Sequence, residues 1–450
     1  MTVQKIDVVY LYEHAARELD VACLVNYLAE QRYGLHIKIA QVRFDLFKIL
    51  SKFNPHIVVV PFCYFADAPY LYTVLLYWPQ AIYFNLAWEE ILSPATYQLK
   101  APRDEFSRKH VLHHAWADFY VEYLRAHQVR EEHIFLNGNP TLMLYDLPYC
   151  QYYEQREAIA HKHNLDPTKR WIFFPESYKR AFLSESDLKK FARLGKNPET
   201  VYSLHRFHQQ SLMAVMRWCG IVASQSDVEL IVRPRPATPL KSFKAAVQEA
   251  LPSIPPRIHF IKSGTVREWI LASDVVFSSD STTLIEAAAA GKPTYIVEPY
   301  PLPDYTYNEW QDHVPHLKTQ AEFEAACLGS LANYDNQLGT WARTTMMACG
   351  DAISNLADFL ARLHRGEIQR PPVPSRASLV ASRNSRLPWW LSDAYLRVYW
   401  WAKREVLKRS NTVGKSRLQY ENDFVSPVEL ERKLARWGKI VDNAISAQRK

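Results

Sequence analysis

The chain has 450 residues, of which 48% are hydrophobic and 13% aromatic, a length and composition that predict two folded domains with appendages. The net charge of +7, from 54 Lys and Arg against 47 Asp and Glu, is too mild to indicate a nucleic-acid-binding protein. The six cysteines include no C-x-x-C pair and glycine occurs only 12 times, which argues against a zinc site and against a Gly-rich dinucleotide-binding enzyme.

Two further features bear on the cellular compartment. The dispersed cysteines predict no disulfide framework, which is typical of proteins in a reducing cytosol. The N-terminus lacks the apolar segment of a signal peptide, and no uninterrupted apolar run reaches the roughly 20 residues that span a bilayer. We therefore expect a cytoplasmic protein without a membrane-spanning helix.

Over the first 150 residues, short runs of β-branched residues alternate with helical patterns. The continuous run at 57–62 is typical of a buried parallel strand. The ranges expected as strands are 6–12, 35–40, 57–62, 81–85 and 134–140. Those expected as helices are 17–31, 45–53 and 104–127.

The same alternation then restarts. The expected strands are 171–174, 228–233, 258–261, 274–277 and 294–297. The expected helices are 198–226, 240–251, 267–272 and 282–290, the last closed by Gly291 as a C-cap glycine closes a helix. Helices from about 319 to 365 are expected to complete the second domain.

Two successive series of this kind predict two doubly wound, Rossmann-like α/β domains. The expected divisions are 1–150 for the first domain, 165–330 for the second, 331–369 for its closing helices, 370–383 for a Pro-rich linker and 384–450 for a basic, aromatic helical tail. Ligands of such sheets bind at the carboxyl ends of the strands, so the expected site is the cleft between the two domains.

The most informative part of the sequence combines two arginines with a hydroxyl-rich turn. Two guanidinium groups between prolines at a strand end suit a phosphate. Further along, a helix begins within a Ser/Thr turn, where free backbone N–H groups and the helix dipole favour an anion. The residues expected to bind nucleotide and phosphate are Arg233, Arg235, Gly264, Thr265, Ser278, Ser281, Thr282, Thr283 and Glu286.

Within this set, Gly264 lies in a tight turn whose backbone would face a base, and Glu286 is within reach of ribose hydroxyls.

The Ser/Thr turn and the two arginines each also have an ordinary structural explanation. Ser and Thr at a helix start often serve only as N-caps, and an arginine at a strand end often forms a surface ion pair. The two features together favour the phosphate site.

This arrangement resembles the nucleotide-binding half of GT-B glycosyltransferases. More narrowly, the chain resembles bacterial surface carbohydrate biosynthesis proteins, which are related to retaining transferases of the CMP-activated ulosonic acid Kdo. The resemblance covers roughly residues 5–300. It is carried by residues 16–20, 88–90 and 138–140 and by 269–274, which lead into the Ser/Thr turn.

Two motifs depart from that family. The family usually has Pro-His-Pro where this chain has Pro234-Arg-Pro236, and an acid-acid-Gly motif appears here as Glu89-Glu90-Ile91. The first change replaces a titratable phosphate ligand with a permanent cation. These departures keep open a function of a different class, a non-catalytic nucleotide-binding scaffold in polysaccharide assembly.

Three carboxylates are candidates for catalysis. A transferase needs a group that takes the acceptor proton or assists the leaving group, and retaining chemistry needs a carboxylate near the anomeric carbon. Glu89 and Glu90 follow a strand of the first domain, and Glu176 follows the first strand of the second. Asp280 is a further candidate. The ordinary alternatives are solvated loop carboxylates and, for Asp280, an N-cap.

The histidines His113, His114, His205 and His208 lie in expected helices without a companion cluster of acids, so no metal site is predicted. GT-B enzymes, by resemblance, need neither a metal nor another cofactor. The nucleotide-sugar donor would be a substrate.

The segment 384–417 is rich in both aromatic and basic residues. Its aromatic members include Trp389, Trp390, Trp400 and Trp401, with arginines and lysines between and after them. Such a mixture suits the headgroup layer of an anionic membrane. The alternative is a helix packed across both domains with its aromatic side chains in the core.

The sequence therefore predicts a metal-independent glycosyltransferase on the inner face of the bacterial inner membrane. It would move Kdo or a related ulosonic acid from a CMP donor to a lipid-linked glycan of capsule or lipopolysaccharide, and would bind no nucleic acid. A UDP-hexose transferase and a CDP-polyol phosphotransferase of the same fold are the enzymatic alternatives.

Overall fold

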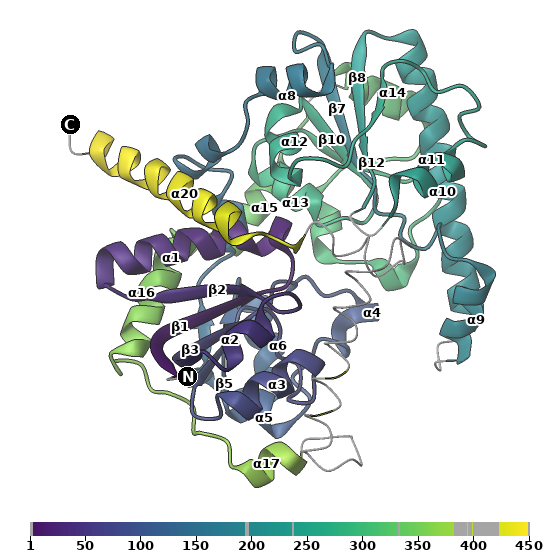
Figure 1. The fold of residues 1–450 in the computed structure, drawn as a ribbon. Coiled ribbons are helices and arrows are strands. Elements are labelled where there is room, and N and C mark those ends of the chain that lie inside the picture. The colour runs from purple at the N-terminus through teal and green to yellow at the C-terminus, as the bar shows by residue number, and fades with distance from the viewer. Residues whose placement is uncertain are drawn as a thin grey trace. The chain divides into compact units, whose positions relative to one another are not determined.

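The computed structural model describes residues 3–193, 198–235, 238–331, 334–381, 394, 398 and 423–448 (Figure 1). The chain divides into two compact units. The first consists of Met1–Leu92, Thr96–Leu144 and Thr344–Lys450, and the second of Ser93–Ala95 and Tyr145–Arg343.

The first unit is built on a parallel sheet of six strands. In chain order these are β1 (Gln4–Tyr12), β2 (Ile37–Gln41), β3 (Phe53–Val60), β4 (Ile82–Asn85), β5 (Val111–Ala115) and β6 (Ile134–Leu136). Their order in the sheet is β2-β1-β3-β4-β5-β6, and every pairing is parallel. The four strand residues from Ile57 to Val60 are fully buried, as expected for a strand covered on both faces.

The helical elements of this unit are η1 (Ala15–Leu19), α1 (Asp20–Tyr33), α2 (Leu46–Leu50), α3 (Pro69–Tyr77), α5 (Glu105–Lys109), α6 (Asp118–Ala126), η2 (Glu131–His133), α7 (Pro140–Met143), α16 (Ala352–His364), α17 (Arg376–Ala381) and α20 (Pro427–Gln448). The short helix α4 (Pro94–Tyr97) lies where the chain passes between the units.

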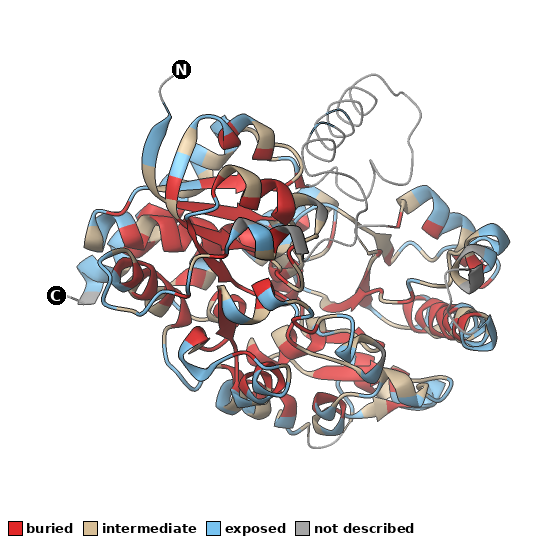
Figure 2. Ribbon diagram, turned by 90° about the horizontal axis from the view of Figure 1, so that it is seen from below, coloured by how far each residue is buried: buried red, intermediate tan, exposed pale blue. Residues whose placement is uncertain are grey.

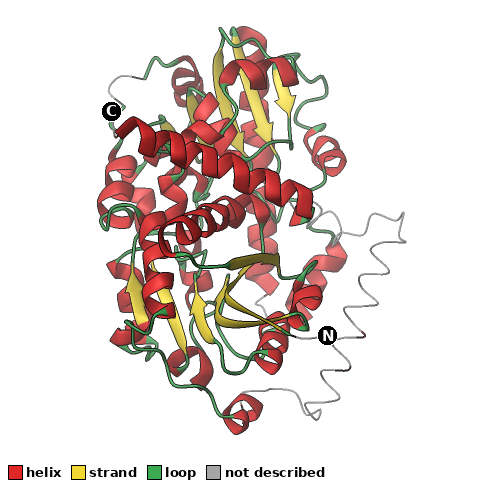
Figure 3. Cartoon of the chain, turned by 60° about the vertical axis from the view of Figure 1, so that its left-hand side comes forward, coloured by secondary structure: helices red, strands yellow, loops and turns green. Residues whose placement is uncertain are grey.

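Helices cover both faces of this sheet (Figures 1 and 3). Alternate strand residues such as Val9 and Val58 pack with apolar residues of α2 and α3 in one core cluster. On the opposite face, the Phe84 ring of β4 lies 4.8 Å from the Phe359 ring of α16. Because successive side chains of a strand point to opposite faces of the sheet, apolar residues of these strands are buried on both faces.

The second unit repeats the plan. Its strands are β7 (Arg170–Pro175), β8 (Val228–Arg233), β9 (Ile258–Phe260), β10 (Val275–Ser278), β11 (Thr294–Val297) and β12 (His316–Leu317). They form a parallel sheet in the order β12-β11-β10-β7-β8-β9. The central strands are the most buried part of the unit (Figure 2).

Its helical elements are η3 (Tyr149–Tyr152), α8 (Arg156–His163), α9 (Glu185–Arg193), α10 (Pro198–Gln225), α11 (Leu240–Val247), α12 (Val266–Ala272), α13 (Thr283–Ala289), η4 (Asp304–Thr306), η5 (Glu309–His313) and α14 (Gln320–Leu328). Helix α15 (Gln337–Met346) spans the boundary with the first unit.

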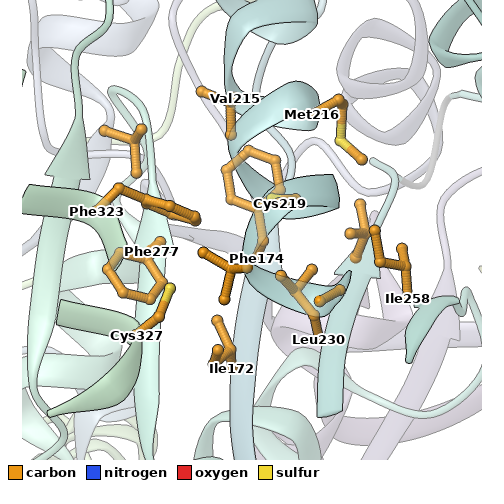
Figure 4. Close-up of a cluster of buried hydrophobic side chains, with 14 of the residues drawn as sticks. Ile172, Phe174, Val215, Met216, Cys219, Leu230, Ile258, Phe277, Phe323 and Cys327 are labelled. Atoms are coloured by element: carbon orange, nitrogen blue, oxygen red, sulfur yellow. The ribbon is translucent and has the colours of Figure 1, made fainter. Parts of the chain in front are cut away.

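The core of the second unit lies between its sheet and helices α10, α11 and α14 (Figure 4). Phe174 of β7 packs in one cluster with Met216 and Cys219 of α10 and with Phe323 of α14. On the opposite face, the Phe173 ring lies 6.4 Å from the Trp269 ring of α12. Each such large apolar side chain contributes about 1.5–3 kcal/mol when fully buried, so β7 is fixed firmly in the middle of the sheet.

The two doubly wound parallel sheets expected from the sequence are confirmed. The helix expected over 104–127 is wrong, because strand β5 interrupts it between α5 and α6. His113 and His114 therefore lie in a fully buried strand, where the His113 ring donates from Nε2 to the Ser107 carbonyl at 2.7 Å. This strand was hidden because two of its five residues are histidines and only Val111 is β-branched.

The chain is also divided differently from the expected domain boundaries. Residues 331–369 were expected to close the second domain, whereas α16 lies in the first unit and packs against α1. The tail expected to be helical contains α20, which also packs against α1. Trp437 of α20 is fully buried there, and its Nε1 donates to Asp20 Oδ1 at 3.4 Å.

Among the residues that the structure describes, none of the helices is long and apolar enough to cross a membrane. The aromatic and basic segment 384–417 lies outside the described residues, apart from Ala394 and Val398.

Candidate functional site

The carboxyl edge of the second sheet brings three of the expected groups together. Strands β10, β7 and β8 are neighbours, so the residues that follow them meet at one edge. Ser278 Oγ donates to the Pro175 carbonyl at 2.6 Å, which joins β10 to β7. The Glu176 amide donates to the Arg233 carbonyl at 2.9 Å, which joins β7 to β8.

Glu176 is held inside this edge. Only 3% of the residue is exposed, and its Oε2 accepts a hydrogen bond from the Arg235 amide at 3.3 Å. No donor among the described residues bonds to Oε1. Burial raises the pKa of Glu176 to about 7, although the Arg235 amide and the positive charge of Arg235 lower it in part. This carboxyl group therefore gains and loses a proton near neutral pH.

The two arginines have different roles in the structure. Arg233 donates from its two terminal nitrogens to the carbonyls of Ser263 at 2.7 Å and Gly264 at 2.8 Å. It thus supports the turn at 263–264. The Arg235 guanidinium makes no hydrogen bond or ion pair with the residues that the structure describes, so it remains available to an anion.

Gly264 and Thr265 are engaged with helix α12. Gly264 has a φ of +74°, and a Cβ at this position would lie 2.8 Å from Glu268 Oε2. Thr265 Oγ1 accepts from the Glu268 amide at 3.2 Å, and Glu268 Oε2 accepts from the Thr265 amide at 2.7 Å. This capping box occupies the Thr265 side chain, so only the backbone of the turn remains for a ligand.

The hydroxyl-rich turn after β10 is partly engaged in its own structure. Ser278 is fully buried, and Ser281 Oγ accepts from the Thr283 amide at 3.3 Å. Thr282 occupies the N-cap position of α13 without a side-chain capping bond. The Ser281 hydroxyl is thus engaged with the first amide of α13, whereas the Thr282 side chain makes no capping bond.

Glu286 lies in the first turn of α13, and its Oε2 accepts a hydrogen bond from Tyr145 Oη at 2.7 Å. Tyr145 is buried and stands 141 positions earlier in the chain. Sequence reasoning missed this pair because no local pattern links the two residues. Tyr145 would fix the carboxylate that was expected to meet a ribose.

Buried polar groups without hydrogen-bond partners among the described residues accumulate beside Glu176. They are Ser177 Oγ, His208 Nδ1 and Ser211 Oγ. The rings of Tyr178 and His208 are 5.9 Å apart. Burial, followed by the charges of Lys179 and Arg180, lowers the pKa of His208 to about 3, so the ring is neutral. Buried polar atoms in a protein interior usually have a partner, which can be an ordered water as well as another protein group.

In the first unit, Glu89 follows β4 and is locked in ion pairs. Its carboxylate lies 2.7 Å from Arg17 and 2.8 Å from Lys100, and 47% of its side chain is exposed. Burial opposes ionisation, but the charges of Lys100 and Arg17 outweigh it and lower the pKa of Glu89 to about 2. Glu89 is therefore a permanent anion at neutral pH.

Glu90 has the opposite character. It is fully buried, accepts from the Trp116 amide at 2.6 Å, and lies 3.6 Å from His114 Nδ1. Burial raises the pKa of Glu90 well above its usual value and lowers that of His114 to about 3, so both side chains are neutral.

The turn after β1 holds another group that sequence reasoning missed. His14 Nδ1 lies 3.0 Å from Asp423 Oδ2, and Asp423 Oδ1 accepts from the Ala15 amide at 2.9 Å. The two side chains stand 409 positions apart in the chain. The only sequence signal near them was the family-like segment 16–20.

The described part of the chain contains no group of three or more side chains arranged to hold a metal ion.

The sequence matches no protein-family model and no curated protein. Similar solved structures exist. A UDP co-structure of S. aureus MnaA aligns at 13% identity over 83% of this chain and 100% of its own, with a TM-score of 0.50. A UDP-N-acetylglucosamine 2-epimerase aligns at 12% identity over 83% of this chain and 100% of its own, with a TM-score of 0.51.

The wall teichoic acid polymerase TagF aligns at 11% identity over 81% of this chain and 90% of its own, with a TM-score of 0.52. At such low identity the likeness establishes the fold and not the activity. The chain has the GT-B fold, with two Rossmann-like units, as the sequence predicted.

Proposed function

We propose that the protein is a transferase that moves a sugar from a nucleotide donor to a glycan of the bacterial surface. The observation that carries this proposal is the hydrogen bond from the Arg235 amide to the buried Glu176 carboxyl group at the carboxyl edge of the second sheet. A guanidinium that makes no hydrogen bond or ion pair with the described residues, a carboxyl group of pKa about 7 and a hydroxyl-rich turn meet there.

Arg235, Thr282 and Thr283 would bind the donor phosphate, and Glu286, oriented by Tyr145, would bind the ribose. A second phosphate would require another arginine, and Arg233 already supports two backbone carbonyls. The engagement of Arg233 leaves Arg235 to bind one phosphate, which supports a donor such as CMP-Kdo or a related CMP-ulosonic acid over a UDP-hexose.

Glu176 would act as the acid that assists departure of the phosphate. A group of pKa about 7 is protonated in part of the molecules at neutral pH, which is the condition under which a general acid works best. The lipid-linked acceptor and the inner face of the membrane remain part of the proposal, through the basic aromatic segment 384–417.

The proposal is tested by incubating the protein with CMP-Kdo, CDP-glycerol and UDP-N-acetylglucosamine and measuring released nucleotide by chromatography. We expect CMP from CMP-Kdo, with at least a roughly 100-fold loss in Arg235→Ala and in Glu176→Gln. Arg217→Ala, at an exposed arginine of α10, is the matched control and should retain full activity.

Other outcomes would redirect the proposal. CMP released from CDP-glycerol alone would indicate polyol-phosphate transfer, and consumption of UDP-N-acetylglucosamine alone would indicate a hexose donor or an epimerase. Nucleotide binding without any turnover would support the non-catalytic scaffold.

A further inference from the structure

The loop after β7 carries an arginine that the proposed function does not use. Arg180 follows Glu176 in this loop, at the carboxyl edge of the second sheet. The residue is half-buried, and its guanidinium makes no hydrogen bond or ion pair with the residues that the structure describes. Burial lowers the pKa of Arg180, which reflects the cost of holding a positive charge partly out of water. An anionic ligand beside the guanidinium would offset this cost.

The backbone of this loop is fixed against helix α10. The Arg180 carbonyl accepts a hydrogen bond from His205 Nδ1 of α10 at 2.6 Å. The Tyr178 carbonyl accepts from the Ala181 amide at 3.0 Å, and the Tyr178 ring lies 5.9 Å from the His208 ring of α10. The base of the Arg180 side chain is therefore held in place although the residue lies in a loop.

A tyrosine from another loop shares the surroundings of Arg180. Tyr305 lies in η4, beyond β11, and its Oη is buried without a hydrogen-bond partner among the described residues. Burial raises the pKa of Tyr305, the positive charge of Arg180 lowers it in part, and Asp280 raises it again, so the hydroxyl keeps its proton at neutral pH. Asp280 Oδ1 accepts from Ser279 Oγ at 3.3 Å. A guanidinium and a phenol hydroxyl thus stand near each other, each with hydrogen-bond donors to offer.

Arg180 and Arg235 belong to the same edge of the sheet. Strands β11, β10, β7 and β8 are consecutive, so the loops that carry Tyr305, Arg180 and Arg235 leave one edge. After burial and the charge of Lys179, the charges of both arginines contribute to the low pKa of His208, so both guanidinium groups lie near this one buried ring. The edge therefore offers a second cation besides the one proposed for the donor phosphate.

We propose that Arg180, together with Tyr305, binds the carboxylate of an acidic sugar in the nucleotide donor. This inference rests on the proposed transfer function and deepens it, because it assigns residues to the sugar of the donor. A guanidinium presents two N–H groups in one plane, which match the two oxygens of a carboxylate, and the phenol hydroxyl donates a further bond. The single charge of Arg180 balances the single charge of the carboxylate.

A preference among donors follows from this assignment. A neutral sugar has no carboxylate, so it would leave the partly buried donors of Arg180 and Tyr305 without an acceptor when the site closes over it. Leaving such groups unpaired costs more than the contact itself is worth. The second unit should therefore select a CMP-activated acidic sugar over the same nucleotide joined to a neutral one.

Calorimetry with CMP, CDP and CMP-Kdo tests this assignment. Every protein carries Glu176→Gln, so that the donor is not consumed during the measurement. Arg180→Ala, Arg180→Lys and Tyr305→Phe are compared with this background, and Arg217→Ala, at an exposed arginine of α10, is the matched control. CMP and CDP report on the nucleotide and its phosphates, and only CMP-Kdo carries a carboxylate.

We expect Arg180→Ala to raise the dissociation constant of CMP-Kdo roughly 10- to 100-fold and to leave those of CMP and CDP unchanged. Tyr305→Phe should raise the dissociation constant of CMP-Kdo roughly 5-fold. Arg180→Lys keeps the charge but loses the planar pair of donors, so it should recover only part of the affinity. Unchanged CMP binding would also show that the variants are folded.

Three results would overturn the proposal. Equal losses for CMP and CMP-Kdo in Arg180→Ala would place Arg180 at the nucleotide phosphate, and a loss for CDP as large as that for CMP-Kdo would assign it to a second phosphate. Unchanged CMP-Kdo affinity in Arg180→Ala is the third. If the background protein binds none of the three ligands, the proposed function fails and the inference fails with it. Binding of CMP without an effect of Arg180→Ala would sink the inference alone.

Discussion

The ionisation state of a carboxyl group in this protein depends on its neighbours more than on its position in the sequence. Glu89 and Glu90 are adjacent, yet the first is held as an anion by Lys100 and Arg17 and the second is neutral in an apolar interior. Glu176 lies between these extremes, because the amide and charge of Arg235 offset only part of the cost of its burial. It is thus the candidate acid suited to neutral pH.

The burial of Glu176 predicts that the free energy of unfolding of the chain depends on pH. The pKa of Glu176 in the folded chain, about 7, exceeds the usual value of 4.5, so the folded state binds more protons. Stability should therefore fall as pH rises from about 4.5 to 7, by about 3 kcal/mol at this site. Glu176→Gln removes this loss of stability, because glutamine does not ionise.

The measurement compares melting temperatures at pH 5 and pH 8. The decrease in melting temperature from pH 5 to pH 8 should be roughly 5 °C smaller in Glu176→Gln than in the wild type. Equal decreases in the two proteins would mean that Glu176 titrates normally.

At the scale of elements, strands with β-branched runs were readily predicted, and those with mixed composition were not. Val228–Arg233 is a strand in the structure as expected, whereas Val111–Ala115 was hidden by its two histidines. The docking of α20 on α1 had no sequence signal either, because Trp437 and its partner Asp20 stand 417 positions apart in the chain.

The α1–α20 interface predicts the effect of a small substitution. A Cβ at Gly438 would lie 2.5 Å from the Tyr27 ring. Gly438→Ala should therefore weaken the docking by about 1–3 kcal/mol despite the higher helix propensity of alanine. Hydrogen exchange of α20 amides measures this effect.

The double variant Tyr27→Ala/Gly438→Ala serves as the control, because it removes the ring that the new methyl group would meet. The α20 amides of the double variant should exchange more slowly than those of the single Gly438→Ala variant. Equal exchange in Gly438→Ala and the wild type would contradict the packing described for this helix.

At the scale of the whole molecule, alternating strands and helices were sufficient to predict two doubly wound sheets. The sequence also predicted that Arg235, Glu176 and the Ser/Thr turn follow strand ends, and the structure shows that these three strands are neighbours in the sheet. The pairs Tyr145–Glu286 and His14–Asp423 were not predictable, since they join distant parts of the chain that only folding brings together.

The segment 384–417 leads to a prediction about membranes. Vesicles with anionic lipid should sediment the protein, and replacement of Trp389, Trp390, Trp400 and Trp401 by alanine should reduce the bound fraction roughly 10-fold. Neutral vesicles are the control. Equal binding of the wild type to anionic and neutral vesicles would contradict the expectation.

Thermal shift with CMP, CDP, UDP, GDP and ADP tests whether the second unit holds a nucleotide phosphate through Arg235. A ligand that binds only the folded state stabilises it, by about 2.7 kcal/mol when the ligand concentration is one hundred times its dissociation constant. The melting temperature rises as a result. We predict that CMP stabilises the wild type and Arg217→Ala and that Arg235→Ala loses the effect. Stabilisation by none of the five nucleotides, or an equal shift in Arg235→Ala, would contradict the account.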